Sequence, residues 1–491
     1  MEGDFDKILN SKNGFRHIAI DARSQIRLLR SQREKSSLAR YSLEAVPIIE
    51  LENKEYTALS YTWGRVCNPN DVREIEVDGQ SFFVRPNLFD FLQTAAAKDE
   101  HGLFFIDALC INQNDVMERQ LQVAMMPQLY RRARTSIVWL GRPERLEMKD
   151  VRSLTQAHRR GCSSWGAAQW RGLKYLSYHD YWRRVWVVQE VLLARELTIW
   201  CGFFSFPASI LAMSSSGVGH DYGQTITVVQ NGRPTVSVDA STRCQSPAEI
   251  IMTDRTRYLI RSKRDELAQG TRIGTLEEMT RLLNRPSTEV VTYQSPIMDP
   301  LYRVVRRFGK LECSDPRDKL YGFLGIIQER SRGLVKLDYT KGVDCAYYQA
   351  LKIGLQEIYE EEASIVYVSQ SEDRKHPYLA FYCEARDAFG IEDEMSLRIV
   401  REVLKELRFR LRAEQDVLAM QTRHQFAWRD DEMRLSPDLE RLFDICGLAK
   451  EENGQGVEGR SRLFRFHQRQ SEWVDKIRSA LQPGSLSKPG D

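Results

Sequence analysis

The chain has 491 residues, more than one hydrophobic core usually holds, so we expect two or three domains. Hydrophobic residues make up 42% and charged residues 28%, as in an ordinary soluble globular protein. Lysine and arginine number 71 against 68 aspartate and glutamate. The resulting net charge of +3 argues against a general affinity for nucleic acid or membranes.

The start of the chain is charged and lacks the apolar core of a secretory signal. No apolar run approaches the length that spans a bilayer. Nine cysteines and eight histidines are scattered, without C-x-x-C or H-E-x-x-H spacing. We therefore expect a cytoplasmic protein with no disulfide framework, no metal and no bound cofactor.

Residues 1–44 form a polar lead-in with an amphipathic, helical stretch at 20–38. Alternating apolar strands and helices then predict an α/β domain at residues 45–205. Its strands are expected at 45–51, 56–63, 74–77, 81–84, 102–106, 136–140 and 197–202. Asp78-Gly79 lies between two alternating runs and predicts a hairpin.

Helices are expected between these strands. One begins at Asn87, and another begins at Asp115-Val-Met-Glu118, which has the form of a capping box. An apolar stripe carries this second helix to Ala133, and Pro127 inside it should bend it. A looser region precedes a further helix at 181–195.

Beyond residue 205 the pattern changes. Residues 206–300 read as a variable, loop-rich insert, residues 301–482 as a mainly helical region, and residues 483–491 as a disordered tail. Helices are expected at 275–285, 300–312, 317–328, 343–362, 394–420 and 461–481. Asp315-Pro-Arg-Asp318 has the form of a helix start, with an aspartate cap and proline at the first position.

The strand at 102–106 runs into a cluster of small polar groups that includes Asp107, Cys110, Asn112 and Gln113. Ligands bind at the carboxyl ends of strands in open α/β sheets. We therefore expect recognition or chemistry at this end of the sheet.

Four segments strongly resemble the HET domain of fungal heterokaryon-incompatibility proteins in amino-acid sequence, order and spacing. They are Tyr56-Thr-Ala-Leu-Ser-Tyr-Thr-Trp-Gly64, Phe105-Ile-Asp-Ala-Leu-Cys-Ile-Asn-Gln113, Val138-Trp-Leu-Gly141 and Tyr181-Trp-Arg-Arg-Val-Trp-Val-Val-Gln-Glu190. The stretch from Asp315 to Gly325 resembles a segment often found downstream of that domain. The resemblance implies a role in allorecognition and programmed cell death after fusion of unlike cells.

The HET domain is regarded as a distant relative of TIR domains, some of which hydrolyse NAD. The resemblance implies a TIR-like or flavodoxin-like open parallel sheet with flanking helices, followed by a mainly α-helical C-terminal region. TIR enzymes carry a catalytic glutamate four residues after a tryptophan. Trp186 and Glu190 have that spacing, which places both on one helix face.

Under this hypothesis NAD is the substrate, and Glu190 is the catalytic carboxylate that stabilises oxocarbenium-like charge on the ribose. Residues around 60–64 and 107–113 would line the pocket. The substrate-binding candidates are Ser60, Tyr61, Trp63, Gly64, Asp107, Asn112, Gln113 and Trp186. The TIR analogy also implies self-association, with an upstream incompatibility or receptor partner.

Each candidate also has a structural interpretation. Glu190 can be an ion-paired helix residue, because three arginines lie near it in sequence. Tyr61 and Trp63 can be core aromatic residues at a strand end. Asp107 can cap the loop by accepting from backbone donors.

Asn112 and Gln113 can equally hold the loop in shape, and Cys110 between apolar neighbours reads as a buried packing residue. The sequence also lacks a glycine-rich phosphate loop. The alternative to an enzyme is therefore an interaction module whose loops bind a partner domain. A third alternative, a nucleic-acid surface on the basic helices, is disfavoured by the near-neutral charge.

Overall fold

The computed structural model describes residues 14–31, 40–64, 71–158, 165–215, 226–230, 233–238, 246–267, 298–364 and 377–422, together with residues 442 and 446. The chain divides into two compact units. Unit 1 runs to residue 298 and also takes in residues 311–313 and 321–326. Unit 2 holds residues 299–310, 314–320 and the chain from 327 onward.

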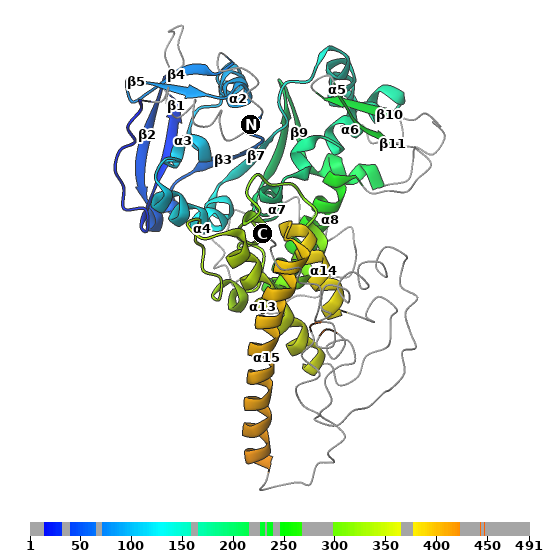
Figure 1. The fold of residues 1–491 in the computed structure, drawn as a ribbon. Helices are drawn as coiled ribbons and strands as arrows, with labels where there is room; N and C mark the ends of the chain where they lie inside the picture. Colours follow the sequence, from blue (N-terminus) through cyan, green and yellow to red (C-terminus); the bar gives the residue numbers. More distant parts are fainter. Residues whose placement is uncertain are drawn as a thin grey trace, which may run out of the picture. The chain divides into compact units, whose positions relative to one another are not determined.

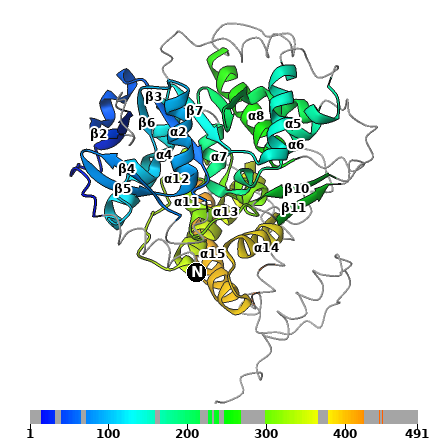
Figure 2. The same ribbon diagram turned by 90° about the horizontal axis from the view of Figure 1, so that it is seen from above.

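Among the described residues of unit 1, nine strands form one sheet in the order β5-β4-β2-β1-β6-β3-β7-β8-β9 (Figures 1 and 2). They are β1 (Gln25–Ser31), β2 (Arg40–Pro47), β3 (Tyr56–Tyr61), β4 (Arg73–Val77), β5 (Gln80–Val84), β6 (Leu103–Phe105), β7 (Thr135–Trp139), β8 (Leu197–Cys201) and β9 (Phe204–Pro207). Strands β10 (Ile226–Gln230) and β11 (Arg233–Val238) pair separately.

The sheet is mixed, with a parallel centre. Strands β6, β3, β7 and β8 are parallel neighbours. In chain order they are the second, first, third and fourth of the parallel set. Antiparallel pairs flank them, namely β1 with β2 and with β6, β4 with β5, and β8 with β9. Strands β2 and β4 form one further parallel pair. The expected open parallel sheet is thus found only in part, because antiparallel pairs on both flanks make the sheet mixed.

The described helices of unit 1 are α2 (Pro86–Ala97), α3 (Asp107–Cys110), α4 (Val116–Arg132), α5 (Arg145–Ala157), α6 (Ala167–Ser177), α7 (Val185–Leu192) and α8 (Pro247–Leu267), with short 3-10 helices at Ile48–Asn53, Asp180–Arg183 and Ala208–Ser215. Phe104 of β6 packs on Phe91 of α2, with ring centroids 6.0 Å apart. The next residue, Phe105, packs on Tyr130 of α4 at 6.2 Å. Successive strand residues face opposite sides, so α2 covers one face of the central sheet and α4 the other.

Several local signals are confirmed. Asp78 and Gly79 turn the β4–β5 hairpin with φ of 50° and 72°, the left-handed conformation that such turns require. Asp115 caps α4 by accepting from the backbone N–H groups of Met117 at 2.9 Å and Glu118 at 3.0 Å. The expected capping box is wrong in one respect, because the Glu118 carboxylate accepts from the Asn112 N–H at 2.7 Å. Pro127 lies inside α4.

Other expectations are corrected. The supposedly helical lead-in contains strand β1, which pairs with β2 over its whole length. Strand β2 ends at Pro47, and a 3-10 helix occupies Ile48–Asn53 where strand was expected. The looser region before residue 181 contains α5 and α6, which pack on each other.

The helix expected at 181–195 is interrupted at Arg184, which is extended with φ −82° and ψ 137°. A remote segment causes the break. The Val185 N–H donates to the Glu312 carbonyl at 2.9 Å, and the Glu312 N–H donates to the Arg183 carbonyl at 2.5 Å. A sequence window around residue 184 contains no sign of this pairing, because Glu312 lies far along the chain.

The described part of unit 2 is mainly helical, as expected. Its helices are α10 (Leu301–Phe308), α11 (Asp318–Tyr321), α12 (Glu329–Arg332), α13 (Val343–Ser364), α14 (Pro377–Phe389) and α15 (Asp393–Thr422). Helix α13 packs against α10, α14 and α15. The expected helix at 317–328 is a single turn, α11, and the next residues, 322–326, are turns that belong to unit 1.

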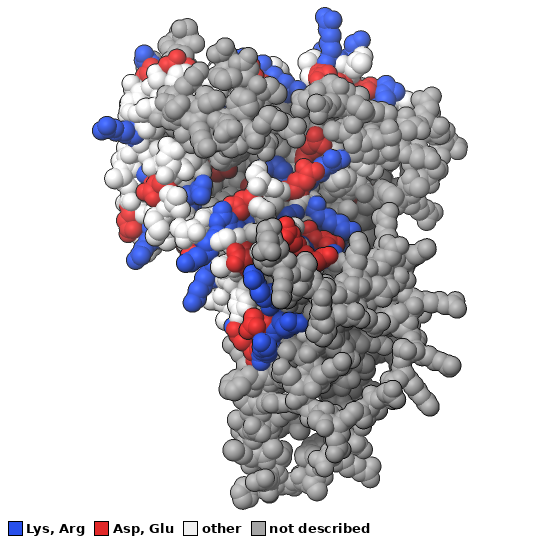
Figure 3. Space-filling view, in the orientation of Figure 1, with Lys and Arg blue, Asp and Glu red and all other residues white. Residues whose placement is uncertain are grey.

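The helices expected at 275–285 and 461–481 and the tail at 483–491 lie outside the described residues. In the part of the chain that the structure describes, every helix falls short of the combined length and apolarity that crossing a bilayer requires. On the face in Figure 3, basic and acidic side chains of the described residues are interspersed, in keeping with the near-neutral charge.

Candidate functional site

The candidate residues fall on two sides of strand β3. Tyr61 pairs in register with Trp139, whose ring packs against Phe91 of α2 with centroids 5.8 Å apart. Ser60, one residue earlier, points to the opposite face and contacts Glu190 of α7. The alternation along β3 therefore separates the glutamate from the aromatic candidates.

Glu190 lies in a buried hydrogen-bonded group beneath the carboxyl end of β3. The Ser60 hydroxyl donates to Glu190 Oε2, and Ser60 Oγ also lies 2.5 Å from the Tyr181 hydroxyl. Only 3% of Glu190 is exposed, and Ser60 and Tyr181 are buried as well. Glu190 is therefore a buried, hydrogen-bonded group and not a solvent-exposed one.

Burial raises the pKa of Glu190 from 4.5 to about 7. The nearby Arg184 guanidinium and the Ser60 hydrogen bond oppose that rise by favouring the carboxylate. Arg184 is itself anchored on β3, since it donates to the Tyr61 carbonyl. A carboxyl group with a pKa near 7 can exchange a proton at neutral pH, the property that acid–base catalysis uses.

Trp186 lies on α7 one turn before Glu190, as the spacing predicts. Its side chain is half-buried.

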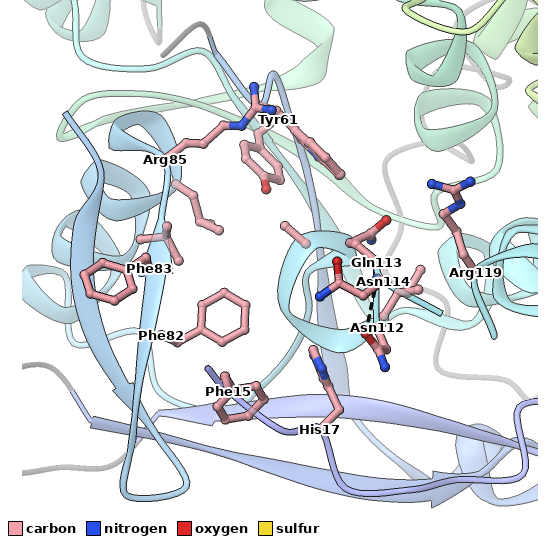
Figure 4. A pocket seen from close by; sticks show the side chains of 15 residues that line it. Phe15, His17, Tyr61, Phe82, Phe83, Arg85, Asn112, Gln113, Asn114 and Arg119 are labelled. Atoms are coloured by element: carbon pink, nitrogen blue, oxygen red, sulfur yellow. Dashed lines mark hydrogen bonds between the residues drawn. The ribbon is translucent and has the colours of Figure 1, made fainter. Parts of the chain in front are cut away.

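The other candidates surround a cavity of about 180 Å³ at the carboxyl ends of β3 and β6, on the α2 side of the sheet (Figure 4). Of the candidates from the sequence, Tyr61, Trp63, Asn112 and Gln113 line it. The remaining predicted residues do not line it, namely Ser60, Gly64, Asp107, Trp186 and Glu190. Ala108 and Ile111, within the range 107–113 named in the sequence, line it as well. The lining residues that the sequence did not indicate are Phe15, His17, Phe82, Phe83, Val84, Arg85, Leu88, Asn114 and Arg119.

Asp107 orients the aromatic wall of this cavity. Its Oδ2 accepts from Trp63 Nε1 at 3.0 Å, and its Oδ1 accepts from the Ala108 N–H at 2.7 Å. Burial raises the pKa of Asp107, and the Trp63 hydrogen bond opposes the rise. The arrangement matches the capping interpretation and adds the tryptophan as a second partner.

Arg85 completes this wall. Its guanidinium lies 5.4 Å from the centre of the Trp63 ring and donates to the Gly64 carbonyl at 2.6 Å. Gly64 has φ of +77°, a conformation that side-chain-bearing residues rarely adopt. Gly64 therefore shapes the turn after β3.

The loop after β6 is held by its own polar groups. The Gln113 amide donates to the Asp107 carbonyl at 3.0 Å, and the Asn114 N–H donates to Asn112 Oδ1 at 3.2 Å. Cys110 is buried, and burial raises the pKa of its thiol to about 12. It is therefore a packing residue.

A buried ion pair fixes the N-terminal side of the cavity. Arg27 and Glu118 bond through two contacts of 2.6 and 3.1 Å. Arg27 also donates to the Ile18 carbonyl at 2.8 and 2.5 Å, which anchors residues 14–18. His17 Nε2 lies 3.1 Å from the Leu109 carbonyl, and the Phe15 ring packs on Phe82 with centroids 5.0 Å apart. Among the described residues, no cluster of His, Cys, Asp and Glu could hold a metal ion.

Comparisons with known proteins agree with the resemblance seen in the sequence. Residues 56–190, from the first residue of β3 to Glu190, match the family model described as heterokaryon incompatibility protein (HET). The chain is 32% identical over 96 residues to heterokaryon incompatibility protein 6, OR allele, of Neurospora crassa. That match covers 18% of this chain and 14% of the relative. No solved structure matches. Residues 56–190 of this chain are thus similar to the HET domain of heterokaryon incompatibility proteins, in agreement with the four sequence segments.

Proposed function

We propose that this chain acts in heterokaryon incompatibility, and that its HET domain triggers cell death by hydrolysing the bond between nicotinamide and ribose in NAD. Glu190 is the catalytic carboxylate of this proposal. Self-association and an upstream partner provide its activation. The match to a heterokaryon incompatibility protein supports the biological role.

The burial and the raised pKa of Glu190 are the main support for the proposed NAD hydrolysis. A buried carboxyl group with a pKa near 7 lowers the stability of the folded chain at neutral pH, and such groups cluster at functional sites. Departure of nicotinamide leaves positive charge on the ribose, and a fixed carboxylate in a site of low polarity stabilises that charge. Ser60 would act as a positioning residue, because it donates to the same carboxyl group.

The order of the parallel strands gives further support. Numbered along the chain, the central parallel strands lie across the sheet in the order second, first, third and fourth. Flavodoxin-like sheets have the same order at their centre, and their ligands bind where the first and third strands diverge. In this chain those strands are β3 and β7. Ser60 lies at the carboxyl end of β3, next to Tyr61. A TIR-like arrangement, as the resemblance implies, has its catalytic glutamate at this end.

A second function, partner binding without catalysis, is favoured by a different observation. Glu190 does not line the cavity, whereas Tyr61, Trp63 and the loop after β6 do. NAD hydrolysis therefore requires the contact between Ser60 and Glu190 to open for the ribose, and an interaction module requires no such movement.

The two functions are separated by incubating the purified full chain with NAD and following nicotinamide release by chromatography. Glu190→Gln keeps the size and the hydrogen-bond acceptor of the side chain and removes its charge. We expect release by the wild type and a loss of at least about 100-fold in Glu190→Gln. Glu196→Gln, a change at an exposed carboxylate just beyond α7, is the matched control and should keep full activity.

Equal nicotinamide release by wild type and Glu190→Gln would remove Glu190 from the chemistry. Absence of release from a wild-type protein that still kills cells would favour the interaction module.

A further inference from the structure

The described residues that line the cavity beside α2 carry charge of one sign. Arg85 and Arg119 are the charged ones, and none of the described lining residues is an aspartate or a glutamate. Burial lowers the pKa of His17, so this residue is neutral at physiological pH. The rest of the wall consists of aromatic and aliphatic side chains and the amides of residues 112–114. The cavity therefore favours a ligand that combines an apolar body with negative charge.

The size of the cavity limits that body to one or two rings. Its volume is about 180 Å³. An engineered apolar cavity of about 150 Å³ binds benzene, so one aromatic ring fits here. Tyr61, Trp63 and Phe82 offer ring faces and edges to such a ligand, and aromatic pairs gain from offset or edge-to-face contact.

The two arginines stand on different sides of this space. In Figure 4, Arg85 lies beside Tyr61, and Arg119 lies beyond the turn that Asn112 and Asn114 form. Guanidinium groups bind carboxylates through two parallel hydrogen bonds, which fixes orientation as well as charge. The side-chain amide groups of the loop can accept hydrogen bonds from the remaining polar edge of the ligand and donate hydrogen bonds to it.

This cavity is distinct from the group around Glu190. Tyr61 faces it from the α2 side of β3, whereas Ser60 and Glu190 meet on the α7 side. A ligand in the cavity therefore need not be a substrate of Glu190, and the inference does not rest on NAD hydrolysis.

We propose that the cavity formed by β5, α2, the loop after β6 and residues 14–18 is a binding site for a small planar aromatic carboxylate. The aromatic wall holds the ring, and Arg85 or Arg119 binds the carboxylate.

The test uses the full chain in isothermal titration calorimetry with benzoate, benzamide and benzylamine, which share one ring and differ in charge. We expect benzoate to bind at least about tenfold more tightly than benzamide, as one charge-assisted hydrogen-bond pair implies, and benzylamine not to bind. AMP, which joins a base to a phosphate, probes a nucleotide as the alternative source of a ring with an anion.

Variants locate the site. Arg85→Gln and Arg119→Gln remove the cations singly, and at least one should weaken benzoate binding about tenfold. Arg145→Gln, a change at an exposed position of α5, should leave benzoate binding unchanged. Ala108→Leu fills the cavity and should abolish binding of every ligand. Unchanged thermal unfolding of each variant shows that it is folded.

Three results would overturn the proposal. They are equal binding of benzoate and benzamide, tighter binding of AMP than of benzoate, and benzoate binding that survives Ala108→Leu together with both arginine changes.

Discussion

The buried Glu190 carboxyl group should make the stability of unit 1 fall as the pH rises. In the folded chain its pKa is raised from 4.5 to about 7, chiefly by burial. Such a group contributes its full stability below the unfolded pKa and loses it as the pH rises through the folded pKa. Each pH unit between the two values is worth about 1.4 kcal/mol, so the loss between pH 4.5 and pH 8.5 is about 3 kcal/mol.

Glu190→Gln should remove this dependence, because the amide keeps an acceptor for Ser60 and never ionises. Between pH 5 and pH 8.5 the stability of the variant should therefore rise by about 2.5 kcal/mol relative to that of the wild type. Urea unfolding followed by tryptophan fluorescence measures the stability of both proteins at each pH, since most tryptophans lie between residues 63 and 200. Glu196→Gln, at an exposed position, is the control. A difference between Glu190→Gln and wild type that is the same at both pH values would refute the reasoning.

Two further changes test the packing around the site. Arg27→Met leaves the Glu118 carboxylate buried without its cation and should lower the free energy of unfolding by about 3–5 kcal/mol, measured with urea. Adding Glu118→Leu should restore part of this loss. A loss below about 1 kcal/mol would contradict the buried pair. Gly325→Ala places a Cβ 2.8 Å from Pro127 and should cost about 1–3 kcal/mol, whereas Gly333→Ala meets only ordinary contacts and should be nearly neutral. Equal melting temperatures of these two glycine variants would show that residues 321–326 do not pack on α4.

Local features could be predicted because neighbouring residues determine them. The Asp78-Gly79 hairpin and the Asp115 cap each depend on groups within four residues. The break at Arg184 and the shortening of α11 could not be predicted, because both depend on residues 311–313 and 321–326 joining unit 1. Distant pairing of this kind leaves no periodic signal in the sequence.

The candidate site was predicted in part for the same reason. Tyr61 is the last residue of β3, and Gln113 lies in the loop after β6. The carboxyl ends of these parallel strands meet, so the approach of both residues to one cavity is a consequence of parallel pairing. Phe15 and His17 reach the cavity through the pair between Arg27 and Glu118, which are 91 residues apart. The separation of Ser60 from Tyr61 follows from strand alternation and could have been derived from the sequence.

The most direct test of the central claim measures NAD content and viability in the same fungal cultures after expression of the wild type or Glu190→Gln. We predict that NAD falls before viability with the wild type, and that neither falls with Glu190→Gln at equal protein levels. Cell death at undiminished NAD with both proteins would contradict it and leave the HET domain as an interaction module.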